Sequence, residues 1–375
     1  MSARRLANIL HLGVKELRSL RRDPLMVAFI AFAFSAAIVS AASVSMELHK
    51  APVAIVDEDR SQLSGTIASA LLAPRLKAPE LVDTHEVDDG MDRGRYTFAL
   101  DIPPDFQRDV LAGKRPAIQL NVDATQTSQA FIGAGYIQRI VADEVATYVR
   151  QQGTGAASPV ELAVRMRFNP NLDSKWFSAV MELINNITML GIILTGAAVI
   201  REREHGTIEH LLSMPLSPAE IMAAKVWANG LVVLATAALS LRFGVEGLLE
   251  VPIAGSVPLF LCGALLHLFA VTSMGIFLGT VARSMPQLAL LVMLVVLPLE
   301  VLSGGMTPRE SMPEFVRTIM LAAPTTHFVS FAQAILYRGA GFDVVWPQFL
   351  AIAGIGGALF AGALVRFRQT VGAQI

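Results

Sequence analysis

Long apolar runs alternate with charged segments along the chain, and their order outlines its architecture. A helix of about 20 apolar residues is long enough to cross the hydrocarbon core of a bilayer. We therefore predict a polytopic α-helical membrane protein with six transmembrane helices. The first is expected at residues 24–45 and the other five lie within residues 176–368, at 176–200, 221–241, 259–281, 288–302 and 345–365.

A different pattern separates the first two apolar runs. Residues 46–175 contain acidic residues, prolines and short alternating segments, and none of their apolar runs is long enough to span a membrane. Strand-like and helix-like patterns alternate there, so we expect a soluble α/β domain with a small mixed sheet. The expected strands are 52–56, 81–87, 96–102 and 117–122, and the expected helices are 61–72, 104–111 and 127–151, with Ser61 and Thr127 as caps.

Lysine and arginine are distributed unevenly around the apolar runs. Residues 1–23 are rich in arginine and have apolar positions on one helical face, which predicts an interfacial helix on the cytoplasmic leaflet. Short basic loops stay in the cytoplasm, so both termini, including the tail 369–375, are expected there, and residues 46–175 are expected to be extracytoplasmic. A signal peptide cleaved after Ala41 or Ala42 is the alternative to a retained first span. The cationic ends used here are Arg201, Arg203, Lys225, Arg283, Arg366 and Arg368.

Composition supports a membrane protein and excludes other classes. Hydrophobic residues make up 53% of the chain and charged residues only 16%, and the formal net charge is -1. Such a chain has no global basic field for nucleic acid. The single cysteine cannot form an intrachain disulfide.

A dense charge cluster lies between the second and third apolar runs, at residues 201–212. Gly206 and Thr207 can end one helical turn and cap the next, which would place Leu212 on the apolar face of a short helix. Glu202, Glu204 and Glu209 would then face water. An ordinary interfacial helix with snorkelling charges is the alternative interpretation.

The run R-E-R-E-H-G-T-I-E-H-L-L-S-M-P-L-S-P-A-E-I, residues 201–221, resembles the cytoplasmic signature of type-2 ATP-binding-cassette (ABC) exporter permeases. Residues 15–24, the S-G-x-x-x-P run that begins at Ser303, and residues 324–328 are similar to other segments of that family. The resemblance implies that residues 201–220 form a coupling helix that docks on a separate ATPase subunit. The coupling residues it implies are Glu202, Arg203, Glu204, Gly206, Thr207, Glu209, Leu212 and Pro215.

The same resemblance implies a partnership. ATP and Mg would bind the partner ABC ATPase, and two permease subunits, identical or different, would form the complex in a bacterial inner membrane. A periplasmic adaptor protein is a further partner that the resemblance allows. The chain contains no phosphate-binding G-x-x-x-x-G-K-[ST] loop and no zinc motif, so we expect no catalytic residue, cofactor or metal in this chain and no enzyme activity without the partner.

Polar residues inside the apolar runs are the other candidate site. Such groups are costly in hydrocarbon, and they persist where they face protein or water. These residues could line a translocation path or subunit seam, or could bond neighbouring helices. Glu182, His267 and Glu300 could alternatively form the proton relay of an ion-coupled secondary transporter, although no inverted repeat is visible. The full candidate set is Glu182, Asn185, Asn186, His267 and Glu300.

Glycine and proline mark the remaining features. Residues 303–336 are expected to form an outer re-entrant region with two short amphipathic helices at 318–323 and 328–336, after a turn that a membrane helix cannot continue. An outer loop is expected at 244–258. Gly275-x-x-x-Gly279 and Gly354-x-x-x-Ala358-x-x-x-Gly362 predict close helix packing. The turn residues are Ser303, Gly304, Gly305, Pro308 and Pro313.

Overall fold

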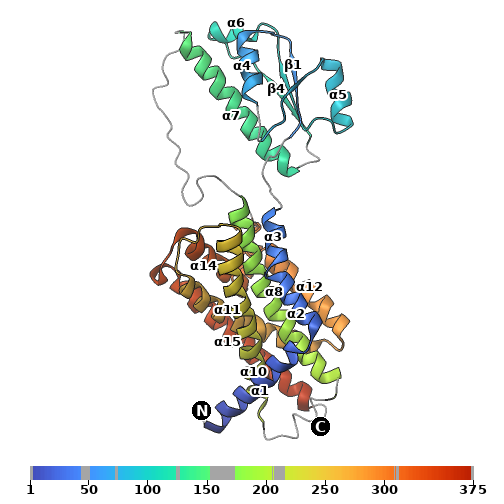
Figure 1. Cartoon of the computed structure of the whole chain (residues 1–375), viewed down its shortest axis with the longest axis vertical. Coiled ribbons are helices and arrows are strands. Elements are labelled where there is room, and N and C mark those ends of the chain that lie inside the picture. Colours follow the sequence, from blue (N-terminus) through green and yellow to red (C-terminus); the bar gives the residue numbers. More distant parts are fainter. Residues whose placement is uncertain are drawn as a thin grey trace. The chain divides into compact units, whose positions relative to one another are not determined.

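The structure is a computed structural model, and it divides the chain into two compact units, Ser45–Arg165 and Met1–Val44 together with Met166–Ile375. We call the first the α/β unit and the second the membrane unit, and each is described by itself (Figure 1). The residues that the structure describes are 3–43, 51–71, 75–123, 127–152, 174–204, 206, 216–307, 309 and 312–372.

A four-stranded mixed sheet forms the centre of the α/β unit, as the alternating runs predict. Its strands are β1 (Val53–Asp57), β2 (Glu80–Leu81), β3 (Phe98–Ile102) and β4 (Gln119–Val122), in the order β2-β1-β3-β4. β1 runs parallel to β2 and β3, whereas β4 is antiparallel to β3.

Helices cover both faces of this sheet. Figure 1 shows α4 (Gln62–Ala70) and α7 (Thr127–Gln151) on one side and α5 (Thr84–Asp92) on the other. Successive side chains of a strand point to opposite faces. Val53 and Ile55 accordingly join the core with α4 and α7, while Ala54 and Val56 pack towards α5. The short helix α6 (Phe106–Leu111) contacts α4.

The strand expected at residues 81–87 is wrong. Strand pairing stops after Leu81, and α5 begins at Thr84. Val87 and Met91 are four residues apart, so in a helix they lie on the same face, and both contact the core around Val56. The apolar residues of this segment thus follow the helical period, which a run of only seven residues did not reveal.

Among the described residues of the membrane unit, five helical segments are long and apolar enough to cross a bilayer: Pro24–Ser43, Lys175–Glu204, Pro218–Leu248, Val257–Val281 and Phe342–Gln369. α12 (Met285–Val301) is apolar but shorter, with 17 residues. At 1.5 Å per residue its length is roughly 26 Å. The chain is therefore a helical membrane protein with five to six apolar spans. The remaining helices are α1 (Ala3–Arg21), α13 (Glu314–Met320) and α14 (Pro324–Arg338).

Several helix boundaries differ from the sequence pattern. The first span is broken into α2 (Pro24–Ala33) and α3 (Ala36–Ser43). The third consists of α10 (Pro218–Leu239) and a π-helical turn, η1 (Ser240–Leu248), so the outer loop expected from residue 244 begins later. The helix expected at 318–323 is shifted towards the N-terminus as α13, and α13 and α14 meet at an angle of 87°.

α11 (Val257–Val281) lies at the centre of the membrane unit, against α8 (Ser174–Glu204), α10, α14 and α15 (Phe342–Gly372). Gly275 and Gly279 allow it to approach α8 closely: a Cβ at Gly275 would overlap the Thr195 hydroxyl and the Ile192 carbonyl. The close packing predicted for this glycine pair is confirmed. No atom of the described residues lies within 4 Å of a Cβ at Gly354 or Gly362.

Candidate functional site

α8 carries the first part of the candidate coupling segment on its last turn. The helix continues without a break to Glu204, and Gly206 follows with a φ of 66°, a left-handed conformation that favours glycine. This agrees with the expected end of a helical turn at that position. Thr207, Glu209, Leu212, Pro215 and the short helix expected around them lie outside the described residues.

The sequence pattern suggested that Glu202 faces water, but the structure buries its side chain. Its side chain is only 11% exposed, and its Oε2 lies 2.8 Å from Nζ of Lys225 on α10. Lys225 is itself 1% exposed, and it also contacts Oε1 of Glu16 on α1 at 3.0 Å. A second lysine, Lys15, lies 3.5 Å from Glu202. We call Glu16, Glu202 and Lys225 the buried ion cluster. The cluster joins α1, α8 and α10 at the end of α8. Lys225, together with the neighbouring Lys15, balances its two carboxylates.

The charge of Glu16 is stabilised within this cluster. Burial raises the pKa of its carboxyl group, but the Lys225 ammonium, a hydrogen bond with Glu202 and the charge of Lys15 together outweigh burial and hold that pKa below its usual value. A buried ion pair of this kind tolerates loss of one partner poorly, because the other charge then remains buried and uncompensated. The buried ion cluster therefore ties α1 to the transmembrane helices.

Three neighbouring contacts fix the end of α8 further. Arg201 forms an ion pair with Asp23 at 2.6 Å, and Asp23 also accepts a hydrogen bond from Met26 N at the start of α2. Arg203 donates to the Ala282 carbonyl, which follows α11. Glu204 is exposed and accepts from the first backbone N–H of α12. The last turn of α8 thus contacts the beginning or end of α2, α11 and α12.

α1 lies against α10 through specific contacts as well as its apolar face. Trp227 Nε1 donates to the Ile9 carbonyl at 3.1 Å, and Asn8 donates to Glu220 at 3.3 Å. Gly13 leaves room for the Trp227 ring, which a Cβ there would overlap. The interfacial helix predicted from the sequence is therefore a docked part of the membrane unit.

Glu182 and Asn186 form a bonded pair on α8. Asn186 donates to Glu182 Oε1 at 3.2 Å and to the Ala33 carbonyl at 2.8 Å. Ala33 is the last residue of α2, where the carbonyls have no partner within the helix. Asn186 thereby stabilises the break in the first span, and Asn185 is half-buried on the same helix.

His267 and Glu300 lie in different surroundings. His267 is fully buried on α11, with Nε2 2.9 Å from the Thr188 hydroxyl and its ring stacked on Phe328 at 4.0 Å. Glu300 lies on α12 beside an apolar cavity that Met26 and Met189 also line. Within the described part of the chain, no hydrogen bond links Glu182, His267 and Glu300. The structure therefore does not assemble the three into a bonded relay.

The turn after α12 is compact. Ser303 is buried and donates to the Glu300 carbonyl at 3.0 Å, and Gly304 adopts a left-handed φ of 97°. Gly305 lies so close to Met181 on α8 that a Cβ would overlap its methyl group. Pro313 directly precedes α13, while Pro308 lies outside the described residues.

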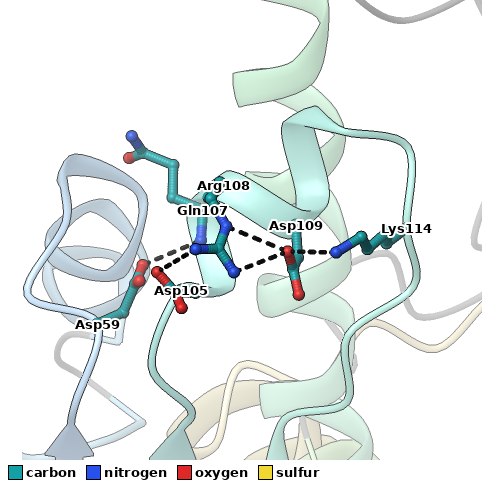
Figure 2. A network of polar contacts seen from close by, with 6 residues as sticks. All are labelled: Asp59, Asp105, Gln107, Arg108, Asp109 and Lys114. Atoms are coloured by element: carbon teal, nitrogen blue, oxygen red, sulfur yellow. Dashed lines mark hydrogen bonds and ion pairs between the residues drawn. The ribbon is translucent and has the colours of Figure 1, made fainter.

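The acidic residues of the α/β unit stabilise its turns. Asp57 accepts from Arg60 N and from the Ser64 hydroxyl, both at 2.8 Å. Among the residues that the structure describes, no three His, Cys, Asp or Glu side chains are grouped to hold a metal ion. Figure 2 shows the adjoining polar network, in which Asp59 accepts from the backbone N–H of Gln107 and ion pairs follow among Asp105, Arg108, Asp109 and Lys114.

Comparison with known proteins decides the family. Residues 25–365 match the family described as ABC-2 family transporter protein, which covers both units. The chain belongs to this ABC-2 family. The resemblance that the charged run at 201–221 suggested is therefore confirmed, and the protein is an ABC transporter permease homologue with several transmembrane helices.

Relatives of this ABC-2 protein match it along nearly its whole length. It is 60% identical over 370 residues to "Inner membrane transport permease YhhJ" of Escherichia coli (strain K12), covering 98% of this chain and 99% of the relative. "Probable multidrug ABC transporter permease YbhR" of the same organism is 29% identical over 376 residues, with 95% and 97% covered. "Probable multidrug ABC transporter permease YbhS" is 25% identical over 332 residues, with 88% of each chain covered.

Sequence reasoning missed the buried ion cluster of this ABC-2 protein. Lys225 was interpreted as a cationic loop residue, and Glu16 received no role. One signal was available: Lys225 lies between Ala223-Ala224 and Val226-Trp227, an apolar setting that requires a partner for its charge. The sequence did not show which residue that partner is, because Glu16 is 209 residues away.

Proposed function

We propose that this chain is the membrane permease subunit of an ATP-driven ABC exporter. It forms the translocation path and couples to a separate ATPase subunit, which binds ATP and Mg, while this chain carries no cofactor. The observation that carries the proposal is the ABC-2 family match over residues 25–365, which includes the charged run after α8. The relatives named as multidrug ABC transporter permeases support the same assignment.

The geometry of α8 supports a coupling role for its last turn. Transmission between subunits needs a rigid element whose contacts differ between two states. α8 is a 31-residue helix, and it passes from the Glu182–Asn186 pair to the buried ion cluster without interruption. Movement of the segment after Glu204 would therefore act on α1, α10 and the start of α12 together.

The proposed topology has six spans, with α12 as the fifth. Both termini and residues 201–220 are cytoplasmic, and residues 46–175 are extracytoplasmic, following the cationic loop ends. The relative named as an inner membrane permease supports a bacterial inner membrane location. A span of 17 residues suits a thin or locally deformed bilayer, or a helix packed against a second subunit.

The proposed complex contains two permease subunits and two ATPase subunits. α12 and α15 expose large apolar side chains, including Leu290, Leu294 and Leu350, that lipid or a second permease subunit would cover. The second subunit is identical or a related chain, and a periplasmic adaptor is a further partner of the extracytoplasmic domain. Glu182, Asn185, Asn186, His267 and Glu300 line the path or the subunit seam in this proposal.

Gly206 offers the sharpest test of coupling. Gly206→Val places a β-branched residue at a φ of 66°, which only glycine and, less readily, asparagine adopt without strain. No atom of the described residues lies within 4 Å of a Cβ there, so their packing is unaffected. We expect export and ATPase co-purification to fall together in Gly206→Val and to be largely retained in Gly206→Asn, at equal expression.

Charge reversal tests the same segment independently. Glu204 is exposed, so Glu204→Arg should reverse a charge at the ATPase interface without unfolding this chain. Glu209→Arg reverses a second charge further along the run. We expect both variants to insert normally, to lose export and to lose a cross-link between a cysteine at Ile208 and the ATPase. Wild-type export by all of these variants would reduce the segment to an interfacial anchor. Proton-driven, vanadate-insensitive transport by the purified subunit would favour the secondary transporter instead.

A further inference from the structure

A polar cavity of about 460 Å³ opens in the membrane unit beside α14. The start of α8, the turn after α12 and one side of α14 surround it, so segments far apart in the sequence build it. Its volume is within the range of small-molecule sites. We call it the α14 cavity.

Two arginines line the α14 cavity, Arg309 in the turn after α12 and Arg338 at the end of α14. Neither guanidinium has a hydrogen bond or ion pair to another residue of the described part of the chain, and the described residues that line the cavity include no carboxylate. Both guanidinium groups are cationic, so together they favour an anion in the cavity. The planar guanidinium fork matches the oxygens of phosphate and carboxylate groups.

Thr326 provides a second, independent observation. It lines the same cavity, is 1% exposed, and its Oγ1 has no hydrogen-bond partner among the described residues. Buried hydroxyl groups are nearly always bonded, so an unpartnered one on a residue that lines the cavity leaves a hydrogen-bonding group for a polar ligand. Ser330 and Gln333 add further polar groups from the same side of α14.

Apolar side chains line the cavity beside these polar groups. Phe177 and Met306 are both exposed large hydrophobic residues, and Val329 lies between the polar positions of α14. A small inorganic anion would leave these surfaces in water. A molecule with an anionic head and a hydrocarbon part would satisfy the arginines and Thr326 and cover the apolar rim.

We propose that the α14 cavity binds the head of an alkyl phosphate, with Arg309, Arg338 and Thr326 as its phosphate contacts and Phe177 and Met306 against its chain. The source is either a phospholipid of the bilayer or an amphiphilic phosphate that enters from solution. The site belongs to this chain alone, so it does not depend on the proposed ATPase partnership.

The test uses the full chain purified in a neutral maltoside detergent, with dodecyl phosphate as the probe. We expect saturable binding of one molecule by native mass spectrometry. Arg309→Gln and Arg338→Gln should each weaken it about tenfold, the effect of losing a charge-assisted hydrogen bond. Arg317→Gln is the matched control, because it removes the same charge from the exposed surface of α13, outside the cavity, and should leave the Kd unchanged.

Thr326→Val separates ligand binding from structure. Valine keeps the shape and removes a hydroxyl that has no partner, so the thermal unfolding temperature should stay equal or rise. Dodecyl phosphate binding should nevertheless weaken. Arg309→Lys keeps the charge without the fork, and if Arg309→Gln fails to fold, a loss of affinity in folded Arg309→Lys carries the test.

Three results would overturn the proposal: equal binding of dodecyl trimethylammonium, an unchanged Kd in the double Arg309→Gln, Arg338→Gln variant, or an unchanged Kd in Thr326→Val. Inorganic phosphate binding as tightly as dodecyl phosphate would also overturn the alkyl part. Phosphatidylglycerol retained from nanodiscs by the wild type and lost in the double variant would support a lipid source. Binding of dodecyl phosphate without retention of phosphatidylglycerol would support an amphiphilic phosphate that enters from solution.

Discussion

Lys225→Met would test whether the buried ion cluster holds α1 on the transmembrane helices. Methionine nearly matches lysine in length but removes the charge, so the substitution leaves Glu16 and Glu202 buried without their shared cation. Lys15 remains, 3.5 Å from Glu202, but its side chain is 51% exposed. Because removing one partner of a buried ion pair typically costs about 3–5 kcal/mol, we expect a loss of that size in the free energy of unfolding.

Trp227 provides the assay. Its indole N–H donates to the Ile9 carbonyl of α1, so in a background with Trp176→Phe and Trp346→Phe, which removes the other two tryptophans, its fluorescence reports on whether α1 is docked. Chemical denaturation in mixed micelles, followed by this emission, gives the change in unfolding free energy. Arg242→Met is the control: Arg242 forms a 2.7 Å ion pair with Glu246 but is 75% exposed, and exposed pairs contribute only about 0–1 kcal/mol.

A triple variant identifies the cause. Glu16→Gln, Glu202→Gln and Lys225→Met together remove every charge of the buried ion cluster, and replacing a whole buried ionic group by neutral residues is often nearly neutral. We therefore expect the triple variant to regain most of the stability that Lys225→Met loses. The reasoning is refuted if Lys225→Met costs less than about 1 kcal/mol, or if the triple variant is less stable than the single one.

Three further outcomes are expected. The pKa of Glu16 is lowered in the folded protein, so its ion pair stabilises α1 docking above the ordinary carboxyl pKa; Trp227 emission should report its loss as the pH falls through that lowered pKa. Gly275→Val should destabilise the membrane unit by about 1–3 kcal/mol, because its side chain would overlap α8, whereas Gly354→Val, in open space, should not change the unfolding temperature. In a chain whose own cysteine is replaced, an impermeant thiol reagent applied from outside should label only the first of three introduced cysteines, at Ser61, Ser213 and Ser284; labelling at the second would contradict the proposed topology.

Much of the fold was predictable, because local patterns determine it. The apolar runs at residues 176–200 and 259–281 lie within α8 and α11, since an α-helix satisfies its backbone groups within its own segment in lipid. Ser61 caps α4 through its side chain, as its position before an amphipathic run indicated. The strand predicted at residues 81–87 was wrong because a segment this short fits both a strand and the start of a helix.

The candidate site was only partly readable. The charged run at 201–221 and its family were recognisable because a contiguous motif keeps its own order in any fold. The orientation of Glu202 was not, since one turn of helix places a side chain towards water or towards protein according to what packs beside it.

The sequence by itself thus determined the spans, their order and the charged segment between α8 and α10, because apolar length and local capping act over a few helical turns. Only the tertiary structure decided that Glu16 and Lys225 meet Glu202, that Asn186 bonds the break after α2, and that Arg309, Arg338 and Thr326 line one cavity. These groups come from segments far apart along the chain. Which of these groups meet depends on how the helices pack, and no local sequence pattern encodes contacts between segments so far apart along the chain.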